Sequence, residues 1–461
     1  MPDTLQSSPD ALTRLATFAA ETPARDIPAE TLAKTALILA DSVGAIAGGA
    51  AESDVQALTV AQLAPGSAIV IGAGQRRAPG VAALLNGTAG TTLEMDEGNQ
   101  FSKGHPGMHT IPAVLAVADP MISGRDLLAA IALGYETGAR IGTASALRPT
   151  MHPHGTWGTL CAASAVARLR GADARAMRQA LNMAASLSLA TSRRTMLEGG
   201  TVRNLYTGMA NQTGVLVGDL LASGYSGDTE GVSQVFGQVV SDGFAEEALT
   251  DQLGTRWEVD RNYFKMHACC RFNHAALDAL AQLTEAEPIA PDAVTRITVE
   301  TYALAAELSD PAPANMLAGK FSLPFAIATA LVNGSTGVES FTAAQVARPD
   351  IRALAAKVDV VEDAALTAML PAHRPARLAM MLTDGRTLHA ATRTNRGDWA
   401  DPYAPDEIHA KFLSLAQRSV SPAAARSLWD LALALPDAPT AQPFLEALSG
   451  GAGAPSSGAT C

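Results

Sequence analysis

Cysteine is scarce in this chain of 461 residues, which contains only four, and no CxxC pair suggests a zinc site. Cys269 and Cys270 are adjacent, which argues against a disulfide framework. The first 21 residues lack a basic start followed by an apolar run, and no uninterrupted apolar stretch is long enough to span a bilayer. These absences predict a cytoplasmic protein with no signal peptide and no membrane segment.

Aromatic residues (5%) and charged residues (17%) are also few, and no run of lysine or arginine occurs. The formal net charge is −12, so the surface repels nucleic acid and anionic lipid, and we expect neither as a partner. Hydrophobic residues make up 48% and are dominated by alanine and leucine. These two residue types favour helices because they lose little conformational freedom on entering one.

Helical spacing of apolar residues dominates the first 265 residues or so. One predicted helix runs from about Pro28 to Ala47, and we expect Gly48-Gly49 to stop it. A second helical stretch, from Ile111 to about Arg140, is interrupted near Ser123-Gly124. Glycine-containing turns separate these helices from further alanine-rich ones. This part of the chain is therefore predicted to be almost entirely α.

Strand-like patterns appear later, at residues 294–302, 358–362, 377–383 and 387–392, and Asp384-Gly385 is a hairpin signal between the last two. After Pro402 the helical pattern returns. The length predicts two or three domains. We therefore expect a mainly α fold with a smaller α+β domain. The predicted parts are an all-helical domain (1–268 with 400–449), an α+β lid domain (269–399) and a flexible tail (450–461).

Residues with reactive side chains gather in four short segments between predicted helices, where functional groups tend to collect. The segments are Glu94 to His109, His152 to Gly158, Thr201 to Asn204, and Lys265 to His274. Histidine suits proton transfer because its ordinary pKa is about 6.5. Lys265, Arg203 and Arg271 could bind substrate carboxylates or stabilise an enolate-like intermediate. The set indicates proton abstraction beside a carboxylate.

Less specific interpretations compete for the same residues. Glu94, Asp96 and Glu97 could form a solvated acidic loop, and His109 and His154 could have only structural roles. The adjacent cysteines fit packing better than nucleophilic catalysis. A metal site built from His152, His154 and the acidic loop is conceivable, but no standard zinc motif is present. GxGxxG, P-loop and GxSxG motifs are absent.

In chain order, several of these segments resemble the signature of the MmgE/PrpD family. Each motif alone is weak, whereas the ordered set, from about Asp41 to Phe325, is specific. The matching segments are Asn86-Gly-Thr-Ala, the acidic loop with His105-Pro-Gly, Ile111-Pro-Ala, Gly134-Tyr-Glu136 with Arg140, the turn from His152 to Gly158, the stretch from Lys265 to His274, and Lys320-Phe-Ser-Leu-Pro-Phe325.

The resemblance implies a large helical domain made from both chain ends, a smaller α+β lid, a homodimer, and an active site between the domains with no required metal or organic cofactor. It also implies acid–base chemistry on a small di- or tricarboxylate. The expected catalytic residues are Glu94, Asp96, His105, His152 and Lys265. The expected substrate-binding residues are Lys103, Arg203, Asn204, His267 and Arg271.

Three departures from the family pattern bear on the reaction. The acidic loop reads Glu-x-Asp-Glu-Gly, with one extra residue before His105; Arg203 replaces a common lysine; and Phe325 stands where the decarboxylase group has a catalytic-site tyrosine. These departures disfavour decarboxylation. We expect dehydration, with epimerisation of the iminodisuccinate type as the alternative. An inactive binding or scaffold homologue and a metal-dependent hydrolase are further alternatives.

Overall fold

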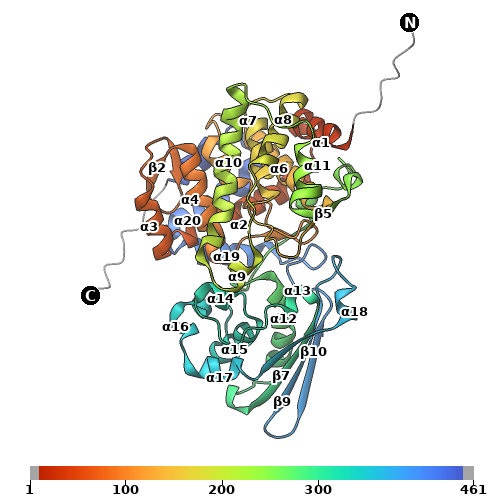
Figure 1. The fold of residues 1–461 in the computed structure, drawn as a ribbon. Coiled ribbons are helices and arrows are strands. Elements are labelled where there is room, and N and C mark those ends of the chain that lie inside the picture. Colours follow the sequence, from red (N-terminus) through yellow and green to blue (C-terminus); the bar gives the residue numbers. More distant parts are fainter. Residues whose placement is uncertain (1–9, 450–461) are drawn as a thin grey trace.

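The computed structural model describes residues 10–449, and it shows a mainly helical protein with a four-stranded sheet (Figure 1). The helices are α1 (Ala11–Glu21), α2 (Ala29–Gly49), α3 (Ser53–Ala61), α4 (Pro79–Thr92), α5 (Ile111–Val117), α6 (Gly124–Ala144), α7 (Gly158–Leu169), α8 (Ala174–Ser186), α9 (Arg193–Leu197), α10 (Leu205–Ala222), α11 (Gly231–Gln234), α12 (Arg271–Ala286), α13 (Ala303–Ala306), α14 (Met316–Lys320), α15 (Leu323–Asn333), α16 (Ala343–Val346), α17 (Pro349–Ala355), α18 (Ala364–Thr367), α19 (Pro405–Ala416), α20 (Pro422–Ala434) and α21 (Gln442–Ala447). The mainly α fold class is confirmed. The predicted tail, 450–461, lies outside the described residues.

The sheet has the strand order β10-β9-β7-β8 (Figure 1). The hairpin predicted around Asp384-Gly385 is present, because β9 and β10 pair antiparallel on either side of it. β7 pairs antiparallel with β9 and parallel with β8, and helix α12 packs against β9 and β10. The strands are β1 (Ala68–Val70), β2 (Gln75–Arg77), β3 (Gly98–Asn99), β4 (Ser145–Leu147), β5 (Ser241–Phe244), β6 (Asn262–Tyr263), β7 (Val294–Thr301), β8 (Val358–Glu362), β9 (Ala376–Leu382) and β10 (Thr387–Thr392).

Helix α2 packs against α4, α19 and α20, and it ends at the second of the two glycines that we expected to stop it. A Cβ atom on Gly49 would collide with the backbone carbonyl of Ala89 in α4. The glycine at the end of α2 therefore also permits a close approach of two helices. α2 is long and apolar enough to cross a membrane, but 83% of its most apolar 18-residue window is buried inside the protein.

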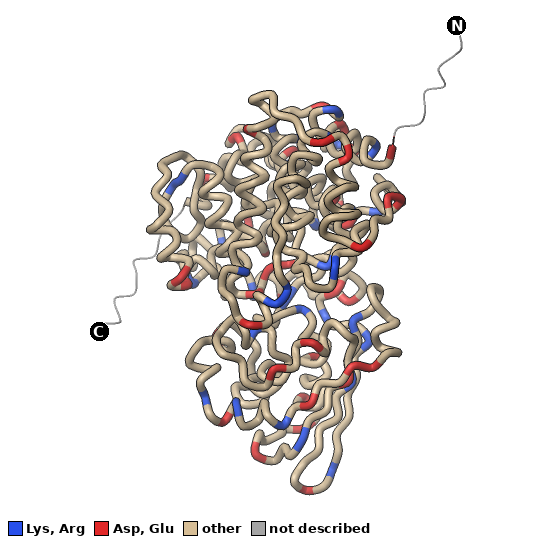
Figure 2. Tube along the Cα trace, in the orientation of Figure 1, with Lys and Arg blue, Asp and Glu red and all other residues tan. Residues whose placement is uncertain are grey.

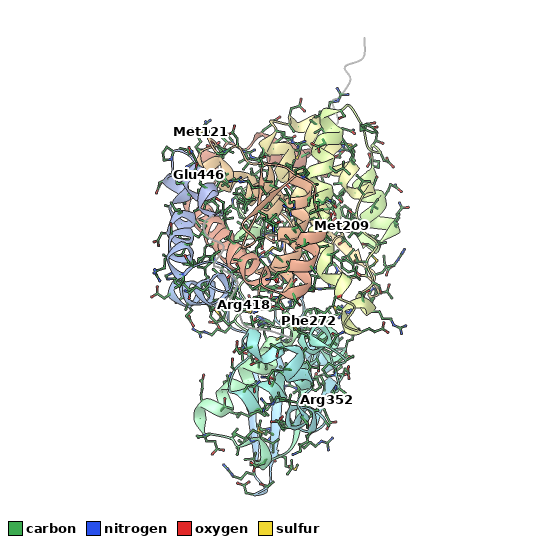
Figure 3. All side chains as sticks on the ribbon, turned by 90° about the vertical axis from the view of Figure 1, so that its left-hand side faces the viewer. Met121, Met209, Phe272, Arg352, Arg418 and Glu446 are labelled. Carbon is green, nitrogen blue, oxygen red and sulfur yellow. The ribbon has the colours of Figure 1, made fainter. Side chains whose placement is uncertain are left out.

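The two ends of the described chain share one hydrophobic core. Its buried side chains come from residues 24–264 and again from 403–448, since α19 and α20 pack back against α2. A second core lies mainly between residues 268 and 382 and covers the sheet. Figure 3 shows the helical part and the sheet part meeting near the labelled Phe272 and Arg418. This packing supports the predicted domain division, which we keep as a proposal.

Candidate active site

A cavity of about 220 Å³ brings together residues from all four reactive segments and from the sheet part of the chain. Figure 2 shows lysine and arginine segments close to the junction of the two parts. The cavity is lined by Glu94, Lys103, His105, Leu147, Arg148, Pro149, Met151, His152, Pro153, His154, Arg193, Met196, Arg203, Tyr263, Cys270, Arg271, Phe272, Leu304, Phe321 and Arg374.

Glu94 follows the end of α4 and adopts a left-handed backbone conformation, with φ at 56°. Such a conformation costs a non-glycine residue about 1–3 kcal/mol and is common at functional sites. Its carboxylate forms ion pairs with Arg203 and with Lys265, whose Nζ is 3.1 Å from Oε2. Burial alone would raise the pKa of Glu94, but these two cations outweigh burial and hold it below its ordinary value. Glu94 is therefore ionised at neutral pH.

Asp96 and His105 form a buried pair. Nδ1 of His105 is 2.9 Å from Oδ2 of Asp96 and 2.6 Å from the carbonyl oxygen of Glu97. A carbonyl can only accept a hydrogen bond, so Nδ1 carries the proton and the lone pair of the neutral ring is on Nε2. Burial would raise the pKa of Asp96, but His105 and Lys265 hold it well below its usual range. The arrangement leaves His105 able to accept a proton at the cavity wall.

Glu97 has a different role from the two acidic residues before it. One of its carboxyl oxygens accepts a hydrogen bond from the amide of Gly107 at 2.8 Å, and the other lies 3.2 Å from the Tyr135 hydroxyl. Burial raises the pKa of Glu97 to about 8. All three acidic side chains are buried, so the interpretation of this segment as a solvated acidic loop is wrong.

The acidic segment is held from behind by the C-terminal part of the chain. Lys411 of α19 donates from Nζ to the carbonyl of Met95, at 2.6 Å, and pairs with Asp41 of α2 at 2.7 Å. Met95 separates Glu94 from Asp96 in the sequence. A buried cation therefore fixes the peptide that carries both carboxylates.

His152 is a second histidine that lines the cavity. Its Nδ1 accepts the backbone N–H of His154 at 3.0 Å, which places the proton of the neutral ring on Nε2. Burial and the charges of Arg203 and Arg193 hold the pKa of His152 well below 6.5. The Nε–H of Arg203 also points at Nε2 of His152, at 3.4 Å, but the contact of the His154 amide with Nδ1 is shorter and therefore decides the tautomer. A neutral imidazole N–H and a guanidinium are thus presented together to the cavity.

His109 and His154 support this arrangement. His109 donates from Nδ1 to the carbonyl of His105, at 2.8 Å, and its Nε2 accepts the amide of Gly155, at 3.2 Å. Both ring nitrogens are thus used, and burial lowers the pKa of His109 to about 4. The ring of His154 packs edge-on against His105 and His152, with centroids 4.7 and 4.6 Å apart. His109 is a structural residue, whereas His154 also reaches the cavity wall.

Four of the expected site residues, Asp96, Lys265, Asn204 and His267, do not line this cavity. Lys265 is fully buried and pairs with Glu94. Its Nζ also forms an ion pair with Oδ1 of Asp96, at 3.6 Å. Asn204 does not line the cavity, but its carbonyl accepts from Thr91 at 3.0 Å and so anchors the turn that carries Arg203. His267 faces a separate pocket, where it contacts Asp278 at 3.1 Å.

Other cavity residues were not singled out from the sequence. Arg374 comes from the segment before β9, and only folding brings it to the cavity, so no local motif marks it. Phe321 also lines the cavity, and the guanidinium of Arg203 lies 5.1 Å from its ring centre. Phe325 instead packs in the core against Phe341, with ring centroids 5.9 Å apart. Phe325 does not line the cavity, so its presence in place of the tyrosine of the decarboxylase group is no longer an argument against decarboxylation.

Metal coordination is not favoured by the described part of the chain. Within residues 10–449, no group of three or more His, Cys, Asp or Glu side chains is arranged to hold a metal ion. The histidine rings of the His-x-His segment are engaged with one another and with backbone groups. The metal-dependent hydrolase alternative thus lacks a ligand set here.

Known proteins are similar in sequence to this chain over most of its length. The chain is 24% identical over 458 residues to the cis-aconitate decarboxylase of Aspergillus terreus, covering 92% of this chain and 93% of the relative. It is 25% identical to the cis-aconitate decarboxylase-like protein oryM of Aspergillus oryzae, covering 95% and 96%. The human cis-aconitate decarboxylase is 24% identical, covering 75% and 74%. Family models match at residues 13–247 (MmgE/PrpD N-terminal domain) and 267–437 (MmgE/PrpD C-terminal domain), and the chain therefore belongs to the MmgE/PrpD family.

Proposed function

We propose that this protein is a lyase that acts on a small polycarboxylate by moving a proton at a carbon beside a carboxylate. The observation that carries the proposal is the buried Asp96–His105 pair, whose free Nε2 belongs to a cavity that also presents Arg203 and the N–H of His152. A base and a positive site for developing charge are the two requirements of such a proton transfer. The similarity to cis-aconitate decarboxylases supports the substrate class.

His105 acts as the base in this proposal. When Nε2 takes the proton from carbon, the ring becomes an imidazolium, and the ionised Asp96 at 2.9 Å stabilises it. Negative charge then develops on the adjacent substrate carboxylate. Arg203 and the N–H of His152 are placed to stabilise that charge, because hydrogen bonds strengthen in a cavity that excludes water.

Dehydration is the reaction that uses all of these groups. The imidazolium of His105 can return its proton to a departing hydroxyl, which leaves as water with the pair of electrons of the broken C–O bond. His152 serves as a neutral hydrogen-bond donor, because its lowered pKa keeps it unprotonated at neutral pH. Lys265 has no direct contact with the substrate in this scheme and acts by orienting Glu94 and Asp96.

Decarboxylation is the second candidate. The observation in its favour is that all three relatives named above are, or resemble, cis-aconitate decarboxylases, while Phe325 lies outside the cavity. In that reaction His105 would start as an imidazolium paired with Asp96 and would deliver its Nε2 proton to the carbon that keeps the electron pair when carbon dioxide leaves. Epimerisation needs the same proton transfer without loss of a group. The homodimer and the cytoplasmic location stay predictions.

The test is to incubate the purified protein with citrate, 2-methylcitrate and cis-aconitate in deuterated water and to follow the products by NMR. A new alkene with loss of water supports dehydration, release of carbon dioxide supports decarboxylation, and inversion with deuterium uptake alone supports epimerisation. The same reactions with His105→Ala should be slower by about 10²–10⁴-fold. If no polycarboxylate reacts or exchanges a proton, the lyase proposal fails and the scaffold alternative gains.

A further inference from the structure

The cavity contains one buried arginine that differs from all its neighbours in having no carboxylate partner. The other four arginines that line the cavity each form an ion pair with an acidic side chain. The pairs are Arg148 with Asp242, Arg193 with Glu307, Arg203 with Glu94, and Arg271 with Asp398. Among the described residues no such pair is found for Arg374, although only 5% of its surface is exposed.

The surroundings of Arg374 fix its position without neutralising it. Nη2 donates to the backbone carbonyl of Gln100 at 3.2 Å, and the guanidinium lies 5.3 Å from the ring centre of Phe272 and 5.9 Å from that of Tyr263. The side chain of Gln100 in turn donates to the carbonyl of Ala372 at 3.2 Å. A guanidinium has five N–H donors, and leaving a buried charge without a counter-charge is unfavourable. The remaining donors of Arg374 are therefore available to an anion in the cavity.

Lys103 is a second cation without an acidic partner in the cavity lining, although its side chain is exposed. It comes from the helical part of the chain and lines the same cavity, and within the described residues its amino group has no ion-pair partner. Its backbone is held in the left-handed region, with φ at 63°. Partial burial and the nearby charge of Arg374 lower the pKa of Lys103. Two like charges placed close together, with no acidic group between them, are stabilised by an anion that binds both.

We propose that Arg374 and Lys103 form a binding subsite for a substrate carboxylate remote from the reacting carbon. The inference rests on the proposed function, in which Arg203 and His152 hold the carboxylate beside that carbon. The substrate then carries at least two carboxylates, one held by Arg203 and His152 and the other by Arg374 and Lys103. Because Lys103 belongs to the helical part and Arg374 to the segment before β9, the remote carboxylate bridges the two parts of the chain.

Isothermal titration calorimetry with propane-1,2,3-tricarboxylate tests the subsite without requiring turnover. Arg374→Gln should weaken binding by about 10- to 100-fold, because a hydrogen-bonded charge is lost. Lys103→Met, at an exposed residue whose replacement leaves the core intact, should weaken it by about 10-fold. Arg377→Gln removes the same charge from nearby β9, where Arg377 is exposed and paired with Asp363, and should not change the affinity.

The outcomes separate the subsite from the function on which it rests. Wild-type binding that persists unchanged in both Arg374→Gln and Lys103→Met overturns the subsite and leaves the lyase proposal standing. Absence of binding to the wild-type protein overturns the subsite, and the turnover test with citrate, 2-methylcitrate and cis-aconitate then decides the lyase proposal separately. If Arg374→Gln does not fold, Lys103→Met decides the question by itself, and Arg374→Lys, which keeps the charge but not the planar fork, should bind with intermediate affinity.

Discussion

Replacing Glu94 and Glu97 with glutamine, one at a time, is expected to change stability in opposite directions, although both carboxyl groups are buried and lie three residues apart. Glu94→Gln removes the negative charge that faces both Arg203 and Lys265. Only Asp96, at 3.6 Å from Lys265, then opposes two buried cations. Breaking a buried ion pair from one side costs about 3–5 kcal/mol, so we expect the free energy of unfolding to fall by roughly that amount at pH 7.

Glu97→Gln should leave stability at pH 7 unchanged or higher. With its pKa raised to about 8, Glu97 is mostly protonated in the folded protein at neutral pH, and glutamine has nearly the same shape. The side-chain carbonyl of the glutamine can accept from the Gly107 amide, and its side-chain amide N–H can donate to the Tyr135 oxygen. In the unfolded chain Glu97 ionises near its ordinary 4.5, and each pH unit between that value and 8 weakens the native state by about 1.4 kcal/mol.

The two residues therefore have opposite signs in their pH dependence. The contribution of Glu97 to the free energy of unfolding is complete below about pH 4.5 and is lost as the pH rises toward 8. The free energy of unfolding of Glu97→Gln, relative to that of the wild type, should therefore increase across that interval. The pKa of Glu94 is lowered, so its contribution is present above its ordinary 4.5 and is lost as the pH falls through its folded value. The loss of free energy of unfolding caused by Glu94→Gln should therefore become smaller as the pH falls.

Urea unfolding followed by circular dichroism at pH 5, 7 and 8 measures both effects. Equal losses of stability in the two variants at every pH would show that the two carboxyl groups have the same protonation state, and would refute the assignment of Glu94 to the ionised network. A gain for Glu97→Gln that does not change with pH would refute the raised pKa of Glu97.

Three further predictions follow from contacts at the site and in the helical part. His105→Ala and His152→Ala should each lower kcat by about 10²–10⁴-fold with an unchanged circular dichroism spectrum; activity near that of the wild type would remove the residue from the mechanism. Lys411→Met leaves a buried carboxylate without its partner and frees the peptide between the catalytic carboxylates, so it should destabilise the fold by about 3–5 kcal/mol and lower kcat; an unchanged urea midpoint would contradict this. Gly208→Ala should cost about 1–3 kcal/mol, because its Cβ would collide with a backbone carbonyl of α4, whereas Gly80→Ala meets its nearest atom at 3.7 Å and should be tolerated; similar thermal midpoints for the two variants would refute the close α4–α10 packing.

The amino-acid pattern by itself determined the elements and the family. The alternation of apolar and polar residues predicted β8 and β10 at their observed bounds, and the break near Ser123-Gly124 separates α5 from α6. These features depend on neighbours within a few residues, so a local pattern can reveal them. The ordered motifs likewise identified the MmgE/PrpD family. The types of side chain at the site were also evident, because charged groups and histidines between apolar helices stand out in the sequence.

Only the tertiary structure decided how deep each side chain lies and which charges meet. Lys265 and Glu94 are 171 positions apart, and their pairing removes Lys265 from the cavity surface. Arg374 enters the cavity from a segment with no motif, while His267 leaves it for Asp278. Gly49 ends α2 as expected, but only the folded structure shows that α4 approaches its backbone too closely for a side chain. In each case the outcome depends on packing between distant segments, and the burial and electrostatic energies that fix a site arise only once those segments meet.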